Sequence, residues 1–518
     1  MRIGHPLARR LAEIGAVLAA VTVKRATHRF TVEQRDVAYE SVYPADDIKE
    51  NPQNAGDLDS VSLAEICAEL GIESVWPLAQ ASRNHVSSYR DRFYYGFRQN
   101  QSDSQIGDFI KGTFLHVRRC FDDFRPDILV LPNFAGLQHI IFSLMAEKRG
   151  VPACAAIDSK VRNVQIFARD HLARRSNYLD RLAELRNGAT SSNIRRAEEY
   201  IAKNRERLSA TSISTSMAKA FAGGNARDGN ELDLVLEPRV GLLAYARALR
   251  MSVAESIAYL RSGRTEHFAN LGVTNDFRPP RFIFRDHFMA VKYRRVAERY
   301  PYAKLDNIGK FVFLPLQVQP EATLNIQAPR FNNQIELARQ VAMSLPGDHT
   351  LVVKDHPNMT WRHPPSYIDK IARTPNVKLV DFRLRAESIL RRASVLVSPS
   401  SSTIAEAALL RVPCIQLGDL GTTAAYPNVT RHRDLSTLSK AILDVLATSV
   451  DSATYDADLN RCVAAAFDVG VESKYHKIWA GEISEEAASE DMKRFITAFV
   501  DEIDRLLGQT CVDAEACS

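Results

Sequence analysis

The sequence predicts an α/β protein with two doubly wound lobes, each a parallel sheet covered by helices, and a helical connector between them. Three observations favour this fold class. The chain has 518 residues, which suggests two to four domains at about 150 residues each. A strand–helix–strand unit is legible in the first third of the chain, and short apolar runs alternate with helical patterns between residues 305 and 450. Parallel strands need such crossover helices, so both regions predict parallel sheets.

The composition is that of a globular protein with a sizeable core. Hydrophobic residues make up 45% of the chain and charged residues 25%, which excludes a disordered chain, a collagen and a coiled-coil rod. Lys and Arg number 67 and Asp and Glu 62, for a formal net charge of +5. The doubled arginines are scattered along the chain. Because the dense basic patch of a nucleic-acid-binding protein is missing, we expect no nucleic-acid partner.

The cysteines and the hydropathy pattern favour a cytoplasmic protein. The seven cysteines include no Cys-x-x-Cys pair and suit buried positions in a reducing compartment. No apolar run reaches the roughly 18 residues of a membrane-spanning helix. The apolar segment 11–23 is predicted to be an ordinary first helix. A targeting segment and peripheral docking at the inner membrane are the alternatives.

The first lobe is predicted over residues 1–185, and its clearest unit lies near its end. Residues 128–131 form an apolar run, 138–148 have a helical pattern, and a second run covers 153–157 after a Gly-Val-Pro turn. Residues 186–304 are polar or helical in pattern, which predicts a mainly helical insertion or connector.

The second lobe is predicted over residues 305–450. Its expected strands are short and apolar, and they cover 311–315, 350–354, 377–380, 394–398 and 412–417. Helices are expected between them at 332–345, 387–392 and 403–410. Helices at 435–447 and 490–507 are expected to close this lobe. Residues 451–518 are assigned to C-terminal helices and a frayed tail that begins at Gly508.

Polar clusters follow three strands of the second lobe at the point where each strand ends. They are 316–323, 354–357 and 400–403, and the last leads into a helix that carries Glu406. In a doubly wound sheet, ligands bind beyond the carboxyl ends of the strands. We therefore expect the three clusters to form one ligand site.

The hydroxyl-rich cluster and the histidine suit a phosphate group. A predicted helix has Ser400, Ser401, Ser402 and Thr403 at its N-terminus. Free N–H groups and the helix dipole favour an anion at such a position. The alternative is that one hydroxyl caps the helix. His356 can donate to a phosphate oxygen or a leaving group, and Pro357 stiffens the end of its strand.

The other polar residues of the three clusters have a functional and a structural interpretation. Glu406, one turn into its helix, can accept ribose hydroxyls or can be a surface carboxylate. Lys354 can balance a phosphate charge or can simply end its strand. Glu321 is an acid in a polar loop, and Gln317 and Gln319 can read a base or a sugar.

Three motifs taken together resemble a known family. They are Gln-Pro-Glu-Ala at 319–322, His-Pro at 356–357 and Ser-Pro-Ser-Ser-Ser-Thr-Ile-Ala-Glu-Ala-Ala-Leu-Leu-Arg-Val-Pro at 398–413. In this order, the chain resembles capsule polysaccharide biosynthesis proteins, which are GT-B glycosyltransferases and include bacterial enzymes that transfer Kdo from CMP-Kdo. The resemblance covers residues 305–445 well and 124–170 loosely. It implies two Rossmann-like lobes in the GT-B arrangement.

The resemblance implies a cytoplasmic glycosyltransferase of cell-surface polysaccharide assembly. It would transfer a sugar from a nucleotide-activated donor, CMP-Kdo or a related sugar, to a growing capsular polysaccharide or glycolipid acceptor. The nucleotide sugar is a substrate, and no resident cofactor is expected. The implied nucleotide-binding residues follow strands of the second lobe: Gln319, Lys354, His356, Pro357, Ser400, Ser401, Ser402, Thr403 and Glu406.

The catalytic residues implied by this interpretation are Glu321, His356 and Asp158. Asp158 follows the strand at 153–157 in the first lobe, which would hold the acceptor. Arg162 lies in the same basic stretch, for which a solvated loop is the alternative.

Two Asp-x-Asp motifs imitate the metal-binding motif of a different transferase class. Asp57-Leu-Asp59 lies in a Gly-, Asn- and Asp-rich loop and Asp456-Ala-Asp458 in a polar tail, so we interpret both as chance matches. No cluster of His, Cys and carboxylates has metal-ligand spacing, and a metal-independent protein is expected.

Other functions stay open on the sequence. One keeps the fold and changes the chemistry, to a polyol-phosphate transferase that releases CMP or to a nucleotide-sugar epimerase. Another is a non-catalytic GT-B-like subunit that binds glycan or belongs to a capsule assembly complex. Thr323 favours the subunit, because the family's Gln-Pro-Glu-Ala stretch ends in an acidic residue and this chain has a threonine there.

Overall fold

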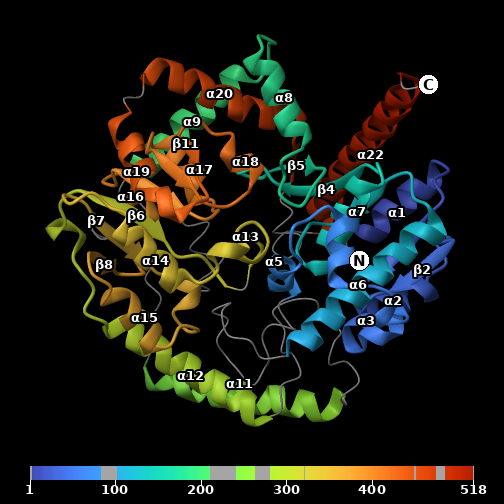
Figure 1. Cartoon of the computed structure of the whole chain (residues 1–518), viewed down its shortest axis with the longest axis horizontal. Coiled ribbons are helices and arrows are strands. Elements are labelled where there is room, and N and C mark those ends of the chain that lie inside the picture. Colours follow the sequence, from blue (N-terminus) through green and yellow to red (C-terminus); the bar gives the residue numbers. More distant parts are fainter. Residues whose placement is uncertain are drawn as a thin grey trace.

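The computed structural model describes residues 3–82, 102–209, 241–262, 280–319, 321–448, 451–473 and 485–516. Two sheet-containing lobes lie side by side, and the helices α11 (Leu242–Ser262) and α12 (Pro280–Arg299) run along one side of the molecule (Figure 1). The predicted fold class, α/β with two lobes and a helical connector, is confirmed.

The second lobe contains a six-stranded sheet in which every neighbouring pair of strands is parallel. Its strands, in chain order, are β6 (Phe311–Pro315), β7 (Thr350–Lys354), β8 (Val377–Val380), β9 (Val395–Ser398), β10 (Cys414–Gln416) and β11 (Val429–Arg431). In space the order is β11-β10-β9-β6-β7-β8, so the chain builds outward from β6 and then restarts on its other side with β9. Doubly wound proteins bind ligands at the carboxyl edge beside such a reversal.

Both faces of this sheet are covered, which explains why its strands are continuous apolar runs rather than alternating ones. Val312 and Leu314 of β6 face one side, and Phe311 and Phe313 face the other. The first face packs against α14 (Gln334–Met343), α15 (Pro365–Ala372) and α19 (Leu438–Ala447). The second packs against α16 (Ala386–Leu390) and α17 (Thr403–Leu409).

The first lobe holds a mixed sheet of four strands in the order β12-β5-β4-β3. The strands are β3 (Leu129–Leu131), β4 (Ala153–Asp158), β5 (Val164–Ala168) and β12 (Val471–Glu472). β3 and β4 are parallel and are joined by α7 (Leu137–Lys148), as the predicted strand–helix–strand unit requires. β5 pairs antiparallel with both β4 and β12, so the expectation of a parallel sheet in each lobe is wrong for the first lobe.

The apolar segment 11–23 is not the single helix that its sequence suggests. The helix α1 (Gly4–Glu13) ends before Gly15, whose φ of 91° lies in the left-handed region that glycine adopts freely. The chain then forms β1 (Ala19–Thr22), which pairs in parallel with β2 (Ser41–Pro44). None of the helices in the described ranges combines the length and apolarity that crossing a bilayer requires.

The last helices do not all close the second lobe, although the sequence analysis expects this. The helix α19 covers the second sheet, whereas α20 (Ser452–Val469) packs on α8 (Asn177–Arg186) and α9 (Ile194–Ser209). The helix α20 also contacts α17 of the second lobe, where the Tyr455 hydroxyl donates to the Ala408 carbonyl at 2.7 Å. The helix α22 (Glu485–Ala516) lies against α1 and β4, because its apolar face contacts Cys154 and Phe167 of the first sheet through Phe495 and Phe499. It continues past Gly508, where the tail is expected to begin.

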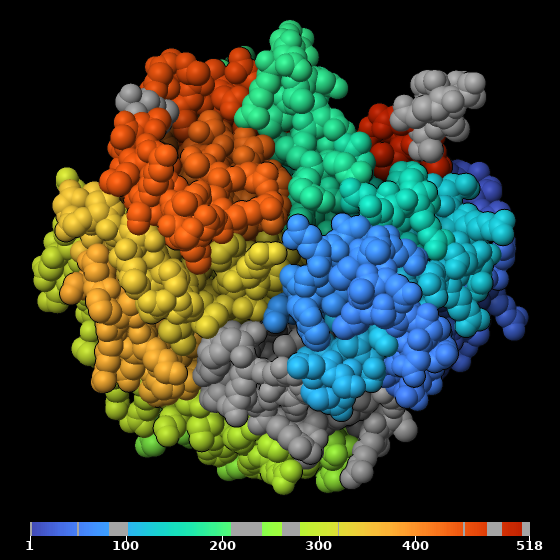
Figure 2. Space-filling model, viewed as in Figure 1, coloured from blue at the N-terminus to red at the C-terminus, as the bar shows by residue number. Residues whose placement is uncertain are grey.

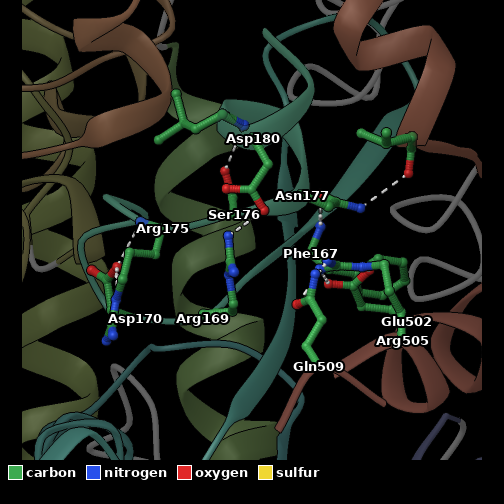
Figure 3. A network of polar contacts seen from close by, with 12 residues as sticks. Phe167, Arg169, Asp170, Arg175, Ser176, Asn177, Asp180, Glu502, Arg505 and Gln509 are labelled. Atoms are coloured by element: carbon green, nitrogen blue, oxygen red, sulfur yellow. Dashed lines mark hydrogen bonds and ion pairs between the residues drawn. The ribbon is translucent and has the colours of Figure 1, made fainter. Parts of the chain in front are cut away.

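A polar network fixes the loop that follows β5 (Figure 3). The Asn177 side chain accepts from the Phe167 backbone N–H at 3.0 Å and donates to the Val469 carbonyl at 3.1 Å. Asp170 is fully buried and accepts from the backbone N–H groups of Leu172 at 2.9 Å and Arg175 at 2.8 Å. These bonds hold the loop in the conformation that meets the second lobe.

The two lobes touch where this loop meets α18 (Gly421–Ala424). The Gly421 N–H donates to the Leu172 carbonyl at 2.8 Å, and Phe134, Ala173 and Leu420 share one apolar cluster. A Cβ on Gly421 would lie 2.2 Å from the Ala173 carbonyl oxygen, which is closer than any side chain tolerates.

We expect Gly421→Ala to destabilise the protein by about 1–3 kcal/mol, because the added methyl group forces the Ala173 backbone away. The free energy of unfolding, measured by urea denaturation, reports the loss. Gly347→Ala is the matched control, since a Cβ there meets nothing within 4 Å. Equal stability of the two variants would contradict the close approach of the lobes.

Candidate functional site

The three predicted polar clusters meet at the carboxyl edge of the second sheet. Pro315 at the end of β6 pairs with Lys354 at the end of β7, and Ser398 at the end of β9 pairs with Gln416 of β10. Because the strands are parallel and in register, the residues that follow them leave the sheet on the same side. This is the edge beside the β6–β9 reversal.

The segment after β6 connects this edge to the first lobe. Its short helix α13 (Ala322–Asn325) is anchored by Asn325, whose side chain donates to the Gln80 carbonyl at 2.8 Å. Asn332 donates to the Gln80 side chain at 2.9 Å, and Ile326 is buried in the core of the first lobe. Figure 2 shows this yellow segment lying against the blue surface of the first lobe.

The amides of Gln317 and Gln319 have partners within the protein. Gln319 is 1% exposed, donates to the Asn332 carbonyl at 2.6 Å and accepts from Gln334 at 3.0 Å. Gln317 donates to the Pro315 carbonyl at 2.9 Å. These bonds shape the segment from inside, so we leave both residues out of the proposed ligand contacts, against the expectation that they read a base or a sugar.

Glu321 lies at the start of α13, between the lobes, and its side chain is exposed. Its carboxylate accepts a hydrogen bond from the Thr323 hydroxyl at 3.1 Å. Thr323 therefore orients the acid of this segment. An exposed carboxylate of this kind is available as a proton acceptor.

Lys354 ends β7 with its side chain buried. The ammonium group donates to the Asp355 carbonyl at 3.1 Å, and the residue is 7% exposed. Burial lowers the pKa of Lys354 to about 8, against the opposing effect of Asp355 and Glu387. The lysine thus carries a desolvated positive charge at neutral pH, which strengthens its attraction for an anion.

His356 follows at the strand exit as a neutral hydrogen-bond donor. Its Nδ1 accepts from the Asn358 backbone N–H at 3.1 Å, so in the neutral ring the proton resides on Nε2. Burial, with Lys354 as the next cause, lowers the pKa of His356 to about 4. Pro357 begins the single turn η7 (Pro357–Met359), which His356 caps.

Asp355 and His363 form a buried pair that holds the backbone of His356, and sequence reasoning gave neither of them a role in the site. Asp355 Oδ1 accepts from the His356 backbone N–H at 2.8 Å, and Oδ2 pairs with His363 Nδ1 at 3.0 Å. The His363 ring stacks on Tyr367 with centroids 3.8 Å apart. Asp355 stands between the two strand-end residues that the sequence analysis selected, so its position alone was a usable signal.

The hydroxyl-rich cluster leads into α17 without capping it. Ser400 donates to the Gln327 side chain at 2.7 Å, and Ser398 donates to the Ser401 hydroxyl at 3.2 Å. Ser402 is the N-cap residue, yet no side chain in the described part of the chain caps the helix. The interpretation in which one hydroxyl serves as the cap is therefore wrong. Thr403 is the first helical residue.

Glu406 lies one turn into α17 in a mixed-charge environment. Burial raises the pKa of Glu406 to about 8, with Glu387 as the next cause, while Arg207, Arg385 and Lys354 oppose the shift. At neutral pH this carboxyl group is mostly protonated and can donate as well as accept. Sequence reasoning missed three of these neighbours of Glu406, namely Arg207, Arg385 and Glu387. Arg385 and Glu387 follow β8, so the strand-end rule applied there would have found them.

Asp158 lies at the end of β4 with its carboxylate exposed. It pairs with the Lys160 ammonium at 3.0 Å, and the Arg162 backbone N–H donates to the Tyr200 hydroxyl of α9 at 3.0 Å. Burial raises the pKa of Tyr200, an effect that Arg162 and Arg207 reduce and Asp158 increases. Asp158 therefore lies near α9, and the same helix contacts α17, which carries Glu406.

The two Asp-x-Asp motifs have structural partners. Asp57 accepts from the Asp59 backbone N–H at 3.0 Å in a single turn. Asp456 binds Arg205 and Arg411, and Asp458 binds Arg186 at 2.6 Å. No group of three or more His, Cys, Asp or Glu side chains in the described residues is arranged to hold a metal ion.

Comparison with known proteins gives distant structural similarity alone. No family model and no curated protein matches the chain. KpsC of Thermosulfurimonas dismutans, a beta Kdo 2,7 transferase, aligns at 12% identity over 68% of this chain and 79% of its own, with a TM-score of 0.28. UDP-GlcNAc 2-epimerase of Methanocaldococcus jannaschii aligns at 12% identity over 88% of this chain and 99% of its own, with a TM-score of 0.25. The Neisseria meningitidis epimerase, solved with UDP-GlcNAc, aligns at 10% identity over 88% and 98%, with a TM-score of 0.25.

Proposed function

We propose that the protein is a glycosyltransferase. It transfers a sugar from a nucleotide-activated donor, CMP-Kdo or a related nucleotide sugar, to a growing surface polysaccharide or glycolipid. The observation that carries the proposal is that a buried ammonium group, Lys354, and a neutral imidazole, His356, lie two residues apart at the end of one strand. A cation and an N–H donor fixed in a desolvated position are what a departing phosphate oxygen requires.

The residues of the edge divide the reaction among them. Lys354 and His356 Nε2–H bind the phosphate of the donor, and the hydroxyl-rich segment 400–403, which precedes α17, adds to the same contact. Glu406 binds the ribose hydroxyls, donating and accepting because it is mostly protonated. The acceptor hydroxyl oxygen forms a bond to the anomeric carbon, and the bond from that carbon to the phosphate oxygen breaks. Glu321 or Asp158 takes the acceptor proton.

The decisive experiment mixes the purified protein with CMP-, UDP- and GDP-sugars and an acceptor extract. A glycosyltransferase releases free nucleotide and extends the glycan. Each alternative has its own result: an epimerised sugar with the nucleotide still attached, a transferred polyol phosphate with free CMP, or nucleotide binding without turnover for a non-catalytic subunit. Absence of nucleotide binding would refute the site assignment.

Nucleotide affinity should fall as pH rises through about 8. Below this pH Lys354 keeps its proton and attracts phosphate, and above it the charge is lost. Glu406 ionises over the same range and adds repulsion, so both groups act in the same direction. We expect Kd for the nucleotide to rise above pH 8 by up to about tenfold per pH unit for each of the two groups that loses its proton. Calorimetric titrations from pH 6.5 to 9.5 test this, with the phosphate-free nucleoside as control. A Kd that does not change would contradict the role of Lys354.

A further inference from the structure

The helix α9 of the connector reaches the candidate site. Its apolar face packs on α17 and α20 through Ala197 and Ile201. Near its C-terminus Arg205 donates to the Leu409 carbonyl of α17 at 2.7 Å and binds Asp456 of α20 at 2.7 Å. The last turn of α9 is therefore held against the helix that carries Glu406.

Arg207, two residues further along, is a partly buried guanidinium that no acidic partner neutralises within the described ranges. Its Nε is buried and makes no hydrogen bond there. Two arginines near it are paired: Arg205 with Asp456, and Arg385, which also acts on Glu406, with Glu387 at 3.3 Å. A desolvated N–H donor without an acceptor is unfavourable, so an acceptor from outside the protein would be bound tightly.

The charges around Arg207 favour an anion as that acceptor. Glu406 is within electrostatic range of Arg207, yet its carboxyl group is mostly protonated at neutral pH, so among the described residues it does not balance the guanidinium charge. Lys354 is a second buried cation within electrostatic range of Glu406. A planar guanidinium donates two parallel hydrogen bonds to a phosphate, a geometry that an ammonium group lacks.

We infer that Arg207 is a ligand-binding residue of the candidate site and that it contacts the phosphate of the bound nucleotide. The inference rests on the proposed function, because the nucleotide is the ligand that the proposal supplies. It makes α9 a third wall of the site, contributed by the connector and not by either sheet. A guanidinium that binds only when a phosphate is present adds selectivity for the charged ligand over its nucleoside.

The test compares the ligand affinities of Arg207→Gln and the wild type by calorimetric titration. The ligands are the nucleotides CMP, UDP and GDP and the matching nucleosides cytidine, uridine and guanosine. We expect the nucleotide that binds the wild type to bind Arg207→Gln on the order of 10- to 100-fold more weakly. The matching nucleoside should bind both proteins equally. Arg195→Gln is the control on the same helix, since Arg195 is 88% exposed and its loss should leave both affinities unchanged.

Each outcome decides one point. Wild-type nucleotide affinity in Arg207→Gln would overturn the inference, and an equal loss for nucleotide and nucleoside would overturn the phosphate contact. Arg207→Lys keeps the positive charge and loses the planar pair of N–H donors, so it should recover part of the affinity. If Arg207→Gln does not fold, Arg207→Lys still tests the contact. A wild type that binds no nucleotide would refute the proposed function itself.

Discussion

Replacing His356 by alanine should lower turnover of the nucleotide sugar by about 10²- to 10³-fold, with the fold intact. The variant removes the Nε2–H donor that we propose binds the leaving phosphate oxygen. Stabilisation of that oxygen grows as the bond to the anomeric carbon breaks, so kcat should fall more than KM rises. Release of free nucleotide, followed over time, measures the effect.

Two further variants separate chemistry from folding. His356 also caps η7 by accepting from Asn358, and loss of that cap alone is expected to cost about 1 kcal/mol of stability. His356→Asn keeps a capping acceptor and should be as inactive as the alanine variant but more stable. His349→Ala, before the opposite end of β7, should retain turnover. Wild-type turnover in His356→Ala would defeat the central residue assignment.

The sheet that carries the site was predictable because its strands are buried on both faces. Such strands are continuous apolar runs, and the predicted bounds of β6, β7 and β8 match the structure residue for residue. From these strands, the strand-end rule predicts Lys354, His356 and Ser400 at one edge of the sheet. The rule works because parallel strands in register necessarily send their next residues to the same side.

The partners of these side chains were not predictable, because they come from distant parts of the chain. The Ser400 hydroxyl hydrogen-bonds to Gln327, and the Gln319 amide hydrogen-bonds to Asn332 and Gln334. A polar side chain at a strand end is equally suited to a ligand and to a neighbouring loop. Arg207 had no local signal at all, since it precedes the strand-end residues of the site by more than 100 residues and resembles any other charged residue on an amphipathic helix.

Replacing Asp355 by alanine should have the largest effect on stability, a loss of about 3–5 kcal/mol. Asp355 is 4% exposed, and its two oxygens hold the His356 backbone N–H and the His363 ring. His363 is 2% exposed and its Nε2 already has no partner among the described residues, so the variant leaves a buried imidazole without any hydrogen bond. Urea denaturation measures the loss.

The same substitution should also weaken nucleotide binding, because the strand exit that orients His356 loses its anchor. Asp355→Asn separates the two effects: its Oδ1 can keep the His356 N–H bond, but its Nδ2 can bond to His363 Nδ1 only if that ring moves its proton to the buried Nε2, so its stability should lie between those of the wild type and Asp355→Ala. Adding His363→Leu to Asp355→Ala removes the stranded imidazole and should restore part of the stability without restoring binding. If the double variant binds nucleotide as the wild type does, Asp355 stabilises the fold only, and His356 is positioned by the cap on Asn358 alone.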